Sequence, residues 1–309
     1  MPLSSNNADR YNEWADTRSW DSAHHFLQEV FGETEFETSL ADEFDVESID
    51  YEDADGTKFR GYLAMPDESF ARPLPAVVIF SDWNGVNAYE KERATALAEM
   101  GYVAFAADYY GTDLQEGLTM SDNIEQSGKL RGNPEIWMRR MQLAIDQIKT
   151  YEEDVDMDKI AIIGYCLGGT GVVLYGNSGG KDAKAAVAFH GSFETVPELA
   201  GDIVPYTLLL AGGDDGMHGN QTVIEEIFNA GKADWEITRF AGLGHGFSDP
   251  DGGAYSLVGD ARSWESMMTV FEELMLVPVK KADEGTEDGA ATTGLLTSAV
   301  ALVAALCVM

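Results

Sequence analysis

Short apolar runs alternate with amphipathic segments between residue 44 and residue 275. Runs of β-branched and aromatic residues, each bounded by glycine, proline or polar residues, are typical of buried strands. They predict strands at 44–53, 58–66, 75–83, 102–110, 159–166, 183–191, 206–213 and 234–242. Helical spacing of apolar residues predicts helices at 88–101, 135–153, 221–231 and 261–275, and a further helix directly after residue 166.

The order of these elements predicts the fold class. The first two strands flank the turn signal Asp55-Gly56, which favours an antiparallel hairpin. Strands that then alternate with helices imply a mostly parallel sheet with helices on both faces. We therefore expect one α/β domain over residues 44–277, with the hairpin as an antiparallel edge.

The segments outside this domain differ from it in composition. Residues 1–43 are predicted to be an acidic N-terminal extension with no visible secretory signal, and residues 278–294 a polar linker. Residues 295–309 are apolar, but a helix of this length, at about 1.5 Å per residue, is shorter than a bilayer core of ~30 Å. The tail is a membrane anchor, the discarded part of a lipid-anchor signal, or a terminal helix packed on the domain. We expect a cytoplasmic protein, with membrane association only through this tail.

Charge and cysteine content narrow the classes of partner. The 309-residue chain has 54 acidic and 20 basic residues, a net charge of −34, which repels nucleic-acid phosphates and anionic lipids. It has two cysteines, Cys166 and Cys307, too few for a disulfide framework or a zinc cluster. Its five histidines do not have metal-ligand spacing, so we expect neither a metal nor a cofactor.

The sequence Gly164-Tyr165-Cys166-Leu167-Gly168 follows a predicted strand and precedes a predicted helix. The pattern glycine, any residue, nucleophile, any residue, glycine in this context is typical of a strained turn that exposes a nucleophile. The N–H of Leu167 at the start of the helix favours an anion beside the sulfur. Taken alone, the segment is also compatible with a structural cysteine in a tight turn.

Two further segments supply candidate partners for the thiol. Asp214 and Asp215 follow a buried strand, at the carboxyl edge where open parallel sheets have their sites. His245 lies in a glycine-flanked loop beyond them, so the order is nucleophile, acid, histidine. The spacing from Gly212 favours Asp215 over Asp214 as the acid. His190 ends another strand and is expected near the cleft, with a local hydrogen bond to backbone.

The chain resembles the dienelactone hydrolase family of α/β-hydrolases from about residue 44 to residue 275. The likeness is carried by "SDWNGVNAYEKERATALAEMGYVAFAADYYG", "GYCLGG", "AVAFHGSF", "AGGDD", "GHGF" and "ARSWESMM". The pair "GYCLGG" and "GHGF" at this separation is the most specific part.

This resemblance implies an α/β-hydrolase fold and a role for individual residues. Cys166 would be the nucleophile, His245 its base and Asp215 the orienting acid. The backbone N–H groups of Leu167 and Trp83 would form the oxyanion hole. The implied substrate is a small-molecule ester or lactone.

Two residues depart from the family pattern. Asp82 stands where many members have a glutamate that helps to form the thiolate, and it is one methylene shorter. Asp249 stands where members of the chlorocatechol pathway have an arginine that binds a substrate carboxylate. Because Asp249 would repel such a substrate, we do not expect dienelactone itself.

A replacement for that arginine is available in the segment before the nucleophile. Arg131, Arg139 and Arg140 are candidates for another carboxylate clamp. For Arg139 and Arg140 the spacing favours ordinary charges on a helix surface.

The expected function is hydrolysis of a carboxylic ester or lactone through a thioacyl-enzyme. A hydrolase fold without activity, used for binding or scaffolding, is the alternative suggested by Asp82, Asp249 and the unusual tail. A transferase or peptidase on the same fold is a third reading, because a fold alone does not determine the chemistry.

Overall fold

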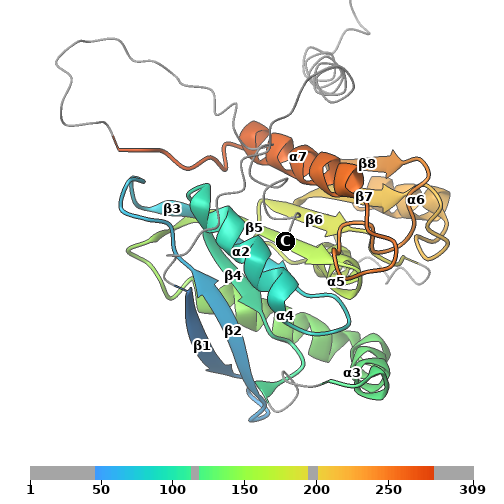
Figure 1. Cartoon of the computed structure of the whole chain (residues 1–309), viewed down its shortest axis with the longest axis horizontal. Coiled ribbons are helices and arrows are strands. Elements are labelled where there is room, and N and C mark those ends of the chain that lie inside the picture. The colour runs from blue at the N-terminus through green and yellow to red at the C-terminus, as the bar shows by residue number, and fades with distance from the viewer. Residues whose placement is uncertain (1–45, 113–117, 194–200, 282–309) are drawn as a thin grey trace, which may run out of the picture. The chain divides into compact units, whose positions relative to one another are not determined.

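The computed structural model describes residues 46–112, 118–193 and 201–281, which form one mixed sheet flanked by helices (Figure 1). The strands are β1 (Val46–Glu52), β2 (Lys58–Ala64), β3 (Leu74–Phe80), β4 (Val103–Ala107), β5 (Val155–Tyr165), β6 (Ala185–Phe189), β7 (Tyr206–Gly212) and β8 (Trp235–Phe240). The helices are α2 (Ala88–Glu99), α3 (Met120–Gly132), α4 (Pro134–Ile148), α5 (Leu167–Asn177), α6 (Gln221–Ala230) and α7 (Leu257–Glu273).

The strand order in the sheet is β1-β2-β4-β3-β5-β6-β7-β8. The β1–β2 and β2–β4 pairs are antiparallel, and every pair from β4 to β8 is parallel. This confirms the predicted α/β-hydrolase fold, with its antiparallel hairpin at one edge. The parallel strands bring their carboxyl ends to one edge of the sheet, where the candidate site residues lie.

Alternation along the central strands divides the core between the two faces of the sheet. In β3, Val77 and Ile79 pack on the side covered by α2 and α7. Val78 and Phe80 pack on the other side, with α4 and α5. All four side chains have no exposed surface, and each such burial stabilises the fold by roughly 1.5–3 kcal/mol. A strand buried on both faces must read as a continuous apolar run, which is how β3 appears in the sequence.

Several elements differ in their bounds from the sequence-based prediction; helix α4, for example, ends at Ile148 rather than 153. Three further differences have an evident cause. Helix α3 was not predicted, because its buried residues are only Asn123, Ser127 and Leu130, which is not an apolar stripe. Helix α7 begins four residues before the predicted 261, at a cap in which Ser256 accepts from the Gly259 N–H. Strand β5 begins at Val155 rather than 159, because Val155 is followed by the half-exposed or exposed residues Asp156, Met157 and Asp158, which interrupt the apolar run.

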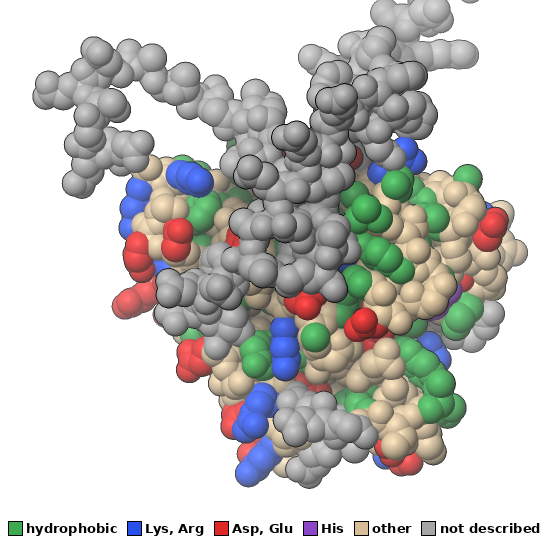
Figure 2. All heavy atoms as spheres, in the orientation of Figure 1, with side chains coloured by type: hydrophobic (Ala, Val, Ile, Leu, Met, Phe, Trp, Pro, Cys, Tyr) green, Lys and Arg blue, Asp and Glu red, His purple; other side chains and the backbone are tan. Residues whose placement is uncertain are grey.

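Beyond α7 the chain pairs with the loop before β3. Lys280 forms a β-bridge with Phe70, and the Ala71 N–H donates to the Val279 carbonyl at 2.7 Å. The predicted N-terminal extension, the linker from residue 282 and the apolar tail lie outside the described residues. Within the described residues, no helix is long and apolar enough to span a bilayer. Acidic and basic side chains are interspersed on the face shown in Figure 2.

Candidate active site

Cys166 occupies a sharp turn between β5 and α5. Its backbone has φ 48° and ψ −103°, a conformation that costs a non-glycine residue energy and that recurs at functional sites. A Cβ atom added at Gly168 would lie 2.2 Å from the Phe80 carbonyl oxygen, and one at Gly164 would lie 2.2 Å from the Gly168 carbonyl. Both glycines are therefore required, because the backbones of β3, β5 and α5 meet here.

The backbone N–H groups of this turn differ in whether they have a partner. The Cys166 N–H donates to the Phe189 carbonyl at 3.0 Å, and the Gly168 N–H donates to the Ser81 carbonyl at 3.0 Å. Among the described residues, neither the Leu167 N–H nor the Trp83 N–H donates to another protein group. Leu167 is the first residue of α5, where the helix dipole favours negative charge. The resemblance implies that these two N–H groups form an oxyanion hole, and that role stays a prediction.

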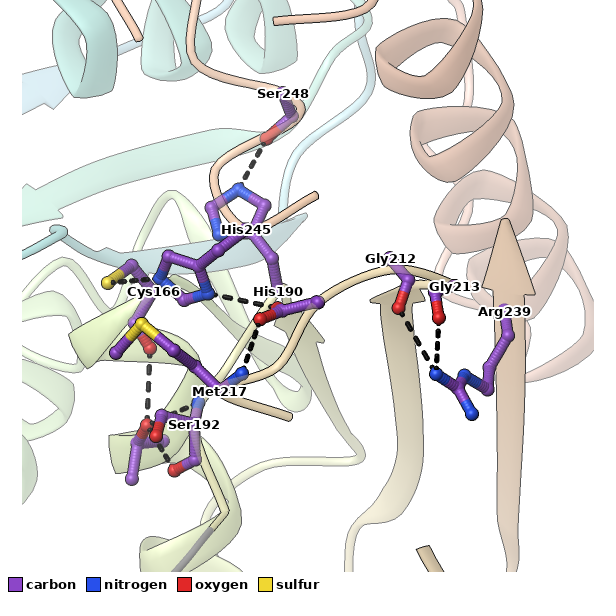
Figure 3. Close-up of polar contacts among 11 residues, drawn as sticks. Cys166, His190, Ser192, Gly212, Gly213, Met217, Arg239, His245 and Ser248 are labelled. Carbon is purple, nitrogen blue, oxygen red and sulfur yellow. Dashed lines mark hydrogen bonds and ion pairs between the residues drawn. The ribbon is translucent and has the colours of Figure 1, made fainter. Parts of the chain in front are cut away.

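His245 connects the thiol to a buried carboxylate. Its Nε2 atom lies 3.0 Å from the Cys166 sulfur, and its Nδ1 atom lies 2.9 Å from Asp215 Oδ2 (Figure 3). The Asp215 side chain is fully buried and accepts a second hydrogen bond from the Met217 N–H at 2.8 Å. Asp214 is exposed and does not make this contact. Of the two aspartates left open by the sequence, Asp215 is thus the partner of the histidine.

The pKa values of this group favour a charged pair. Burial lowers the pKa of His245, but its hydrogen bonds to Asp215 and Cys166 outweigh burial and raise that pKa to about 10. For Asp215, burial acts to raise the pKa, and the hydrogen bond from His245 reverses the effect, so the pKa lies below its usual value. At neutral pH the arrangement therefore holds an imidazolium between the sulfur and an ionised carboxylate.

Asp82 belongs to a small group of carboxylates whose charges interact with His245 or with one another. Both of its carboxylate oxygens accept from Asn84, one from the backbone N–H at 2.6 Å and one from Nδ2 at 3.0 Å. Its own N–H donates to Glu90 Oε1 at 3.2 Å. Burial, with a further contribution from Asp249, raises the pKa of Asp82 to about 6. Burial and the nearby Asp82 raise the pKa of Glu90 to about 8. Burial therefore favours the protonated, uncharged form of Asp82 more than an exposed position would.

Asp249 follows His245 by four residues and is half-buried. Its carboxylate accepts from the Asp251 N–H at 3.0 Å. Burial, followed by the charge of Asp251, raises the pKa of Asp249. Since it also raises the pKa of Asp82, its charge acts on the site as well as on its own loop.

His190 lies against His245, with ring centroids 5.5 Å apart. Its Nε2 atom bonds to the hydroxyl of Ser248 at 2.9 Å, a contact that was not predicted. The strand end of His190 and the loop of Ser248 are distant in sequence, so no local pattern indicates this contact.

The arginines of α4 are engaged elsewhere. Arg139 pairs with Asp53 at 2.8 Å and Asp55 at 2.7 Å, as expected for a helix-surface charge. Arg140 is half-buried and donates to the Tyr109 carbonyl at 2.8 Å. The prediction of an ordinary helix-surface charge is therefore wrong for Arg140. Arg131 on α3 is exposed.

Two tyrosines at the end of β4 position the loop that follows β3. The Tyr109 hydroxyl donates to the Ser81 carbonyl, and the Tyr110 hydroxyl donates to the Trp83 carbonyl at 3.0 Å. Sequence reasoning missed both roles. The only available signal was a pair of hydroxyl-bearing aromatics directly after a buried strand.

In comparisons with known proteins, residues 59–275 match the dienelactone hydrolase family. A protein of Aquifex aeolicus, provisionally named a carboxymethylenebutenolidase, is 27% identical over 234 residues, which cover 70% of this chain and 94% of its own. The crystal structure of P91, a dienelactone hydrolase-like promiscuous phosphotriesterase from metagenomic libraries, has a TM-score of 0.68 and 32% identity. The match covers 75% of this chain and 98% of the P91 chain. Esterase 2 of Thermogutta terrifontis, with a TM-score of 0.56 and 18% identity, shares the fold; it covers 75% of this chain and 95% of its own.

Proposed function

Since the chain belongs to the dienelactone hydrolase family, whose members hydrolyse esters and lactones, we propose that Cys166 is the nucleophile of this hydrolase, with His245 and Asp215 as its partners. The observation that carries the proposal is the pair of contacts on opposite sides of one imidazole, 3.0 Å to the sulfur and 2.9 Å to the carboxylate. A nucleophile, a base and an orienting carboxylate in this relation are the requirements for acyl transfer.

The first half of the reaction forms a thioacyl-enzyme. The thiolate of Cys166 attacks the carbonyl carbon, and the electron pair of the C=O bond moves to the oxygen. The N–H groups of Leu167 and Trp83 stabilise this oxyanion. When the tetrahedral intermediate collapses, the C–O bond breaks and the leaving oxygen takes the proton from Nε2 of His245.

The second half releases the acid. His245, now neutral, removes a proton from water while the water oxygen attacks the thioester carbon. Collapse of the second intermediate breaks the C–S bond and regenerates the thiolate beside the imidazolium. Asp215 holds the imidazole in one tautomer throughout and stabilises its charged form.

We assign Asp82 as the carboxylate that helps to form the thiolate. Its pKa of about 6 is suited to accepting and releasing a proton near neutral pH. The acidic residue four positions after His245 also favours uncharged esters or lactones, because Asp249 would repel a substrate carboxylate.

The test is turnover of uncharged aryl esters and small lactones by the wild type and by Cys166→Ala. We expect the substitution to abolish turnover and to abolish acylation of the protein seen by mass spectrometry. Cys307→Ala, which removes the other cysteine, is the matched control and should keep full activity. Equal turnover by Cys166→Ala would contradict the proposal. No turnover by the wild type, with a Cys166 thiol that reacts no faster than free cysteine, would support a binding or scaffold protein instead.

A second candidate activity is hydrolysis of uncharged phosphotriesters. It is favoured by the 32% identity to P91, a promiscuous phosphotriesterase. The same thiolate can attack phosphorus, and the same two N–H groups can stabilise the charged phosphoryl oxygen. Release of the aryl alcohol from an uncharged aryl phosphotriester by the wild type, and its loss in Cys166→Ala, would support this activity.

A further inference from the structure

A buried hydrogen-bonded chain behind His245 has no part in the mechanism described so far. The Tyr89 hydroxyl lies 2.9 Å from Ser248 Oγ, and Ser248 Oγ lies 2.9 Å from His190 Nε2. Exposure of the three residues is only 5%, 0% and 1%, respectively. Burying three polar side chains is costly unless they bond to one another, so this chain is a specific feature of the fold.

The backbone of Ser248 is also anchored. Arg93 donates to the Ser248 carbonyl at 3.0 Å and forms an ion pair with Asp260 at 2.6 Å. Both side chains of this ion pair are almost fully buried. Arg93 comes from α2 and Asp260 from α7, so both helices hold the loop three residues after His245.

The ring of His190 contacts the ring of His245 directly. Their centroids are 5.5 Å apart with an interplanar angle of 70°. His190 also packs edge-on against Phe247, with centroids 5.3 Å apart. The backbone of His190 has φ 39°, an unfavourable conformation for a residue with a side chain. Such strain persists where the surroundings impose it, often next to a reacting group.

His190 is uncharged in this position. Burial, and then the charge of His245, lowers the pKa of His190 to about 3. A neutral ring can lie against the His245 imidazolium, whereas a second cation would repel it.

We propose that His190, tethered by the Ser248 hydroxyl, is a positioning residue that fixes the plane of His245 and so the contact between its Nε2 atom and the Cys166 sulfur. This inference rests on the proposed function, because it assigns the contact a catalytic role. The ionisable groups that interact with the two rings come from four other parts of the fold. They are Cys166 after β5, Asp215 after β7, Asp82 after β3 and Arg93 on α2.

The test compares three variants by two readouts. His190→Phe keeps an aromatic ring without the nitrogen, His190→Gln keeps a polar atom near the place of Nε2, and Ser248→Ala removes the tether. The readouts are kcat and KM for an uncharged aryl ester, and the ultraviolet absorbance of the Cys166 thiolate during a pH titration. The spectrum of Cys166→Ala is subtracted to remove other contributions.

We expect His190→Phe and Ser248→Ala to lower kcat by about tenfold to a hundredfold with little change in KM, because small displacements of a catalytic group reduce the rate by such factors. The thiolate should form at higher pH, because a displaced imidazolium stabilises it less. His190→Gln should recover part of both losses.

The matched control is Ser263→Ala on α7. Ser263 is as buried as Ser248, but its hydroxyl donates to the Asp260 carbonyl of its own helix. If His190→Phe and Ser248→Ala match this control in kcat and in the thiolate titration, the inference is wrong, whatever their melting temperatures. The titration does not require turnover, so a wild type without esterase activity would contradict the proposed function and still leave the positioning role measurable.

Discussion

His245 and Cys166 are 79 residues apart in the chain, yet Nε2 of one lies 3.0 Å from the sulfur of the other. Neither residue lies within a strand or helix. Each occupies a loop at the same edge of the sheet, and the sheet supplies the rigid support between them. The sheet can therefore keep the distance between His245 Nε2 and the Cys166 sulfur constant when other loop residues are substituted.

Replacement of Asp215 by asparagine should weaken the charged pair without removing the side chain. Without the carboxylate, the pKa of His245 falls, and the imidazolium that protonates the leaving group is lost at lower pH. We expect kcat to drop by about 10²- to 10⁴-fold, and the alkaline limb of kcat/KM to move to lower pH. Asp214→Asn, next to it and exposed, is the control and should leave the profile unchanged. A normal profile in Asp215→Asn would show that another group orients the histidine.

Substitution of Gly168 by alanine should destabilise the protein. The new Cβ would lie 2.2 Å from the Phe80 carbonyl oxygen and 2.6 Å from that of Ser81, and neither backbone atom can move freely. We expect a loss of about 3 kcal/mol or more in the free energy of unfolding, measured with urea. The control is Gly128→Ala on α3, where the added Cβ atom would have no other atom within 4 Å. This substitution should increase the free energy of unfolding by roughly 0.5–1 kcal/mol. Equal effects at the two positions would contradict the close backbone packing described above.

The buried carboxyls of α2 and the preceding loop should make stability depend on pH. The pKa of Glu90 is raised to about 8 and that of Asp82 to about 6, so the folded protein binds more protons than the unfolded chain above their ordinary pKa values. Stability from this pair therefore falls as the pH rises from about 4 to 8. In urea titrations at pH 5 and pH 8, Glu90→Gln should lose less stability over this interval than the wild type. Glu152→Gln, at an exposed position, should behave like the wild type. If Glu90→Gln and the wild type lose the same free energy of unfolding between pH 5 and pH 8, Glu90 is ionised in the folded protein.

A change of charge at residue 249 should change the preferred substrate. With Asp249→Arg, the repulsion of a substrate carboxylate is replaced by attraction. We expect kcat/KM for an anionic ester, relative to its uncharged analogue, to increase by about tenfold or more, which corresponds to roughly 1.4 kcal/mol. Asp249→Asn should give an intermediate ratio, and high salt should reduce both effects. If the ratio is independent of this residue, Asp249 does not face the bound substrate.

The sequence predicts the sheet and the contacts of His245 with Cys166 and Asp215 because both have local signals. Strand β3 is a continuous apolar run, and Cys166 and His245 are each flanked by glycines that a tight turn requires. Helix α3 has no such signal, since it buries two polar residues and one leucine.

The support behind His245 could not be predicted from the sequence. Ser248 and His190 are 58 residues apart, and Arg93 and Asp260 are 167 residues apart. Each of these residues is ordinary in its own segment, and only the arrangement of α2, α7 and the loop shows that they are partners. Contacts of this kind depend on tertiary packing, which a periodic pattern does not encode.

The backbone contact at Gly164 and Gly168 has a consequence for evolution. A Cβ atom added at Gly164 or Gly168 would lie 2.2 Å from backbone atoms where β3, β5 and α5 touch, whereas the Cys166 side chain contacts His245. The atom at the end of side chain 166 can therefore change among small side chains, while the size of residues 164 and 168 cannot. A lineage could exchange sulfur for oxygen here in one step, but it could not add a single methyl group on either side without rebuilding the turn.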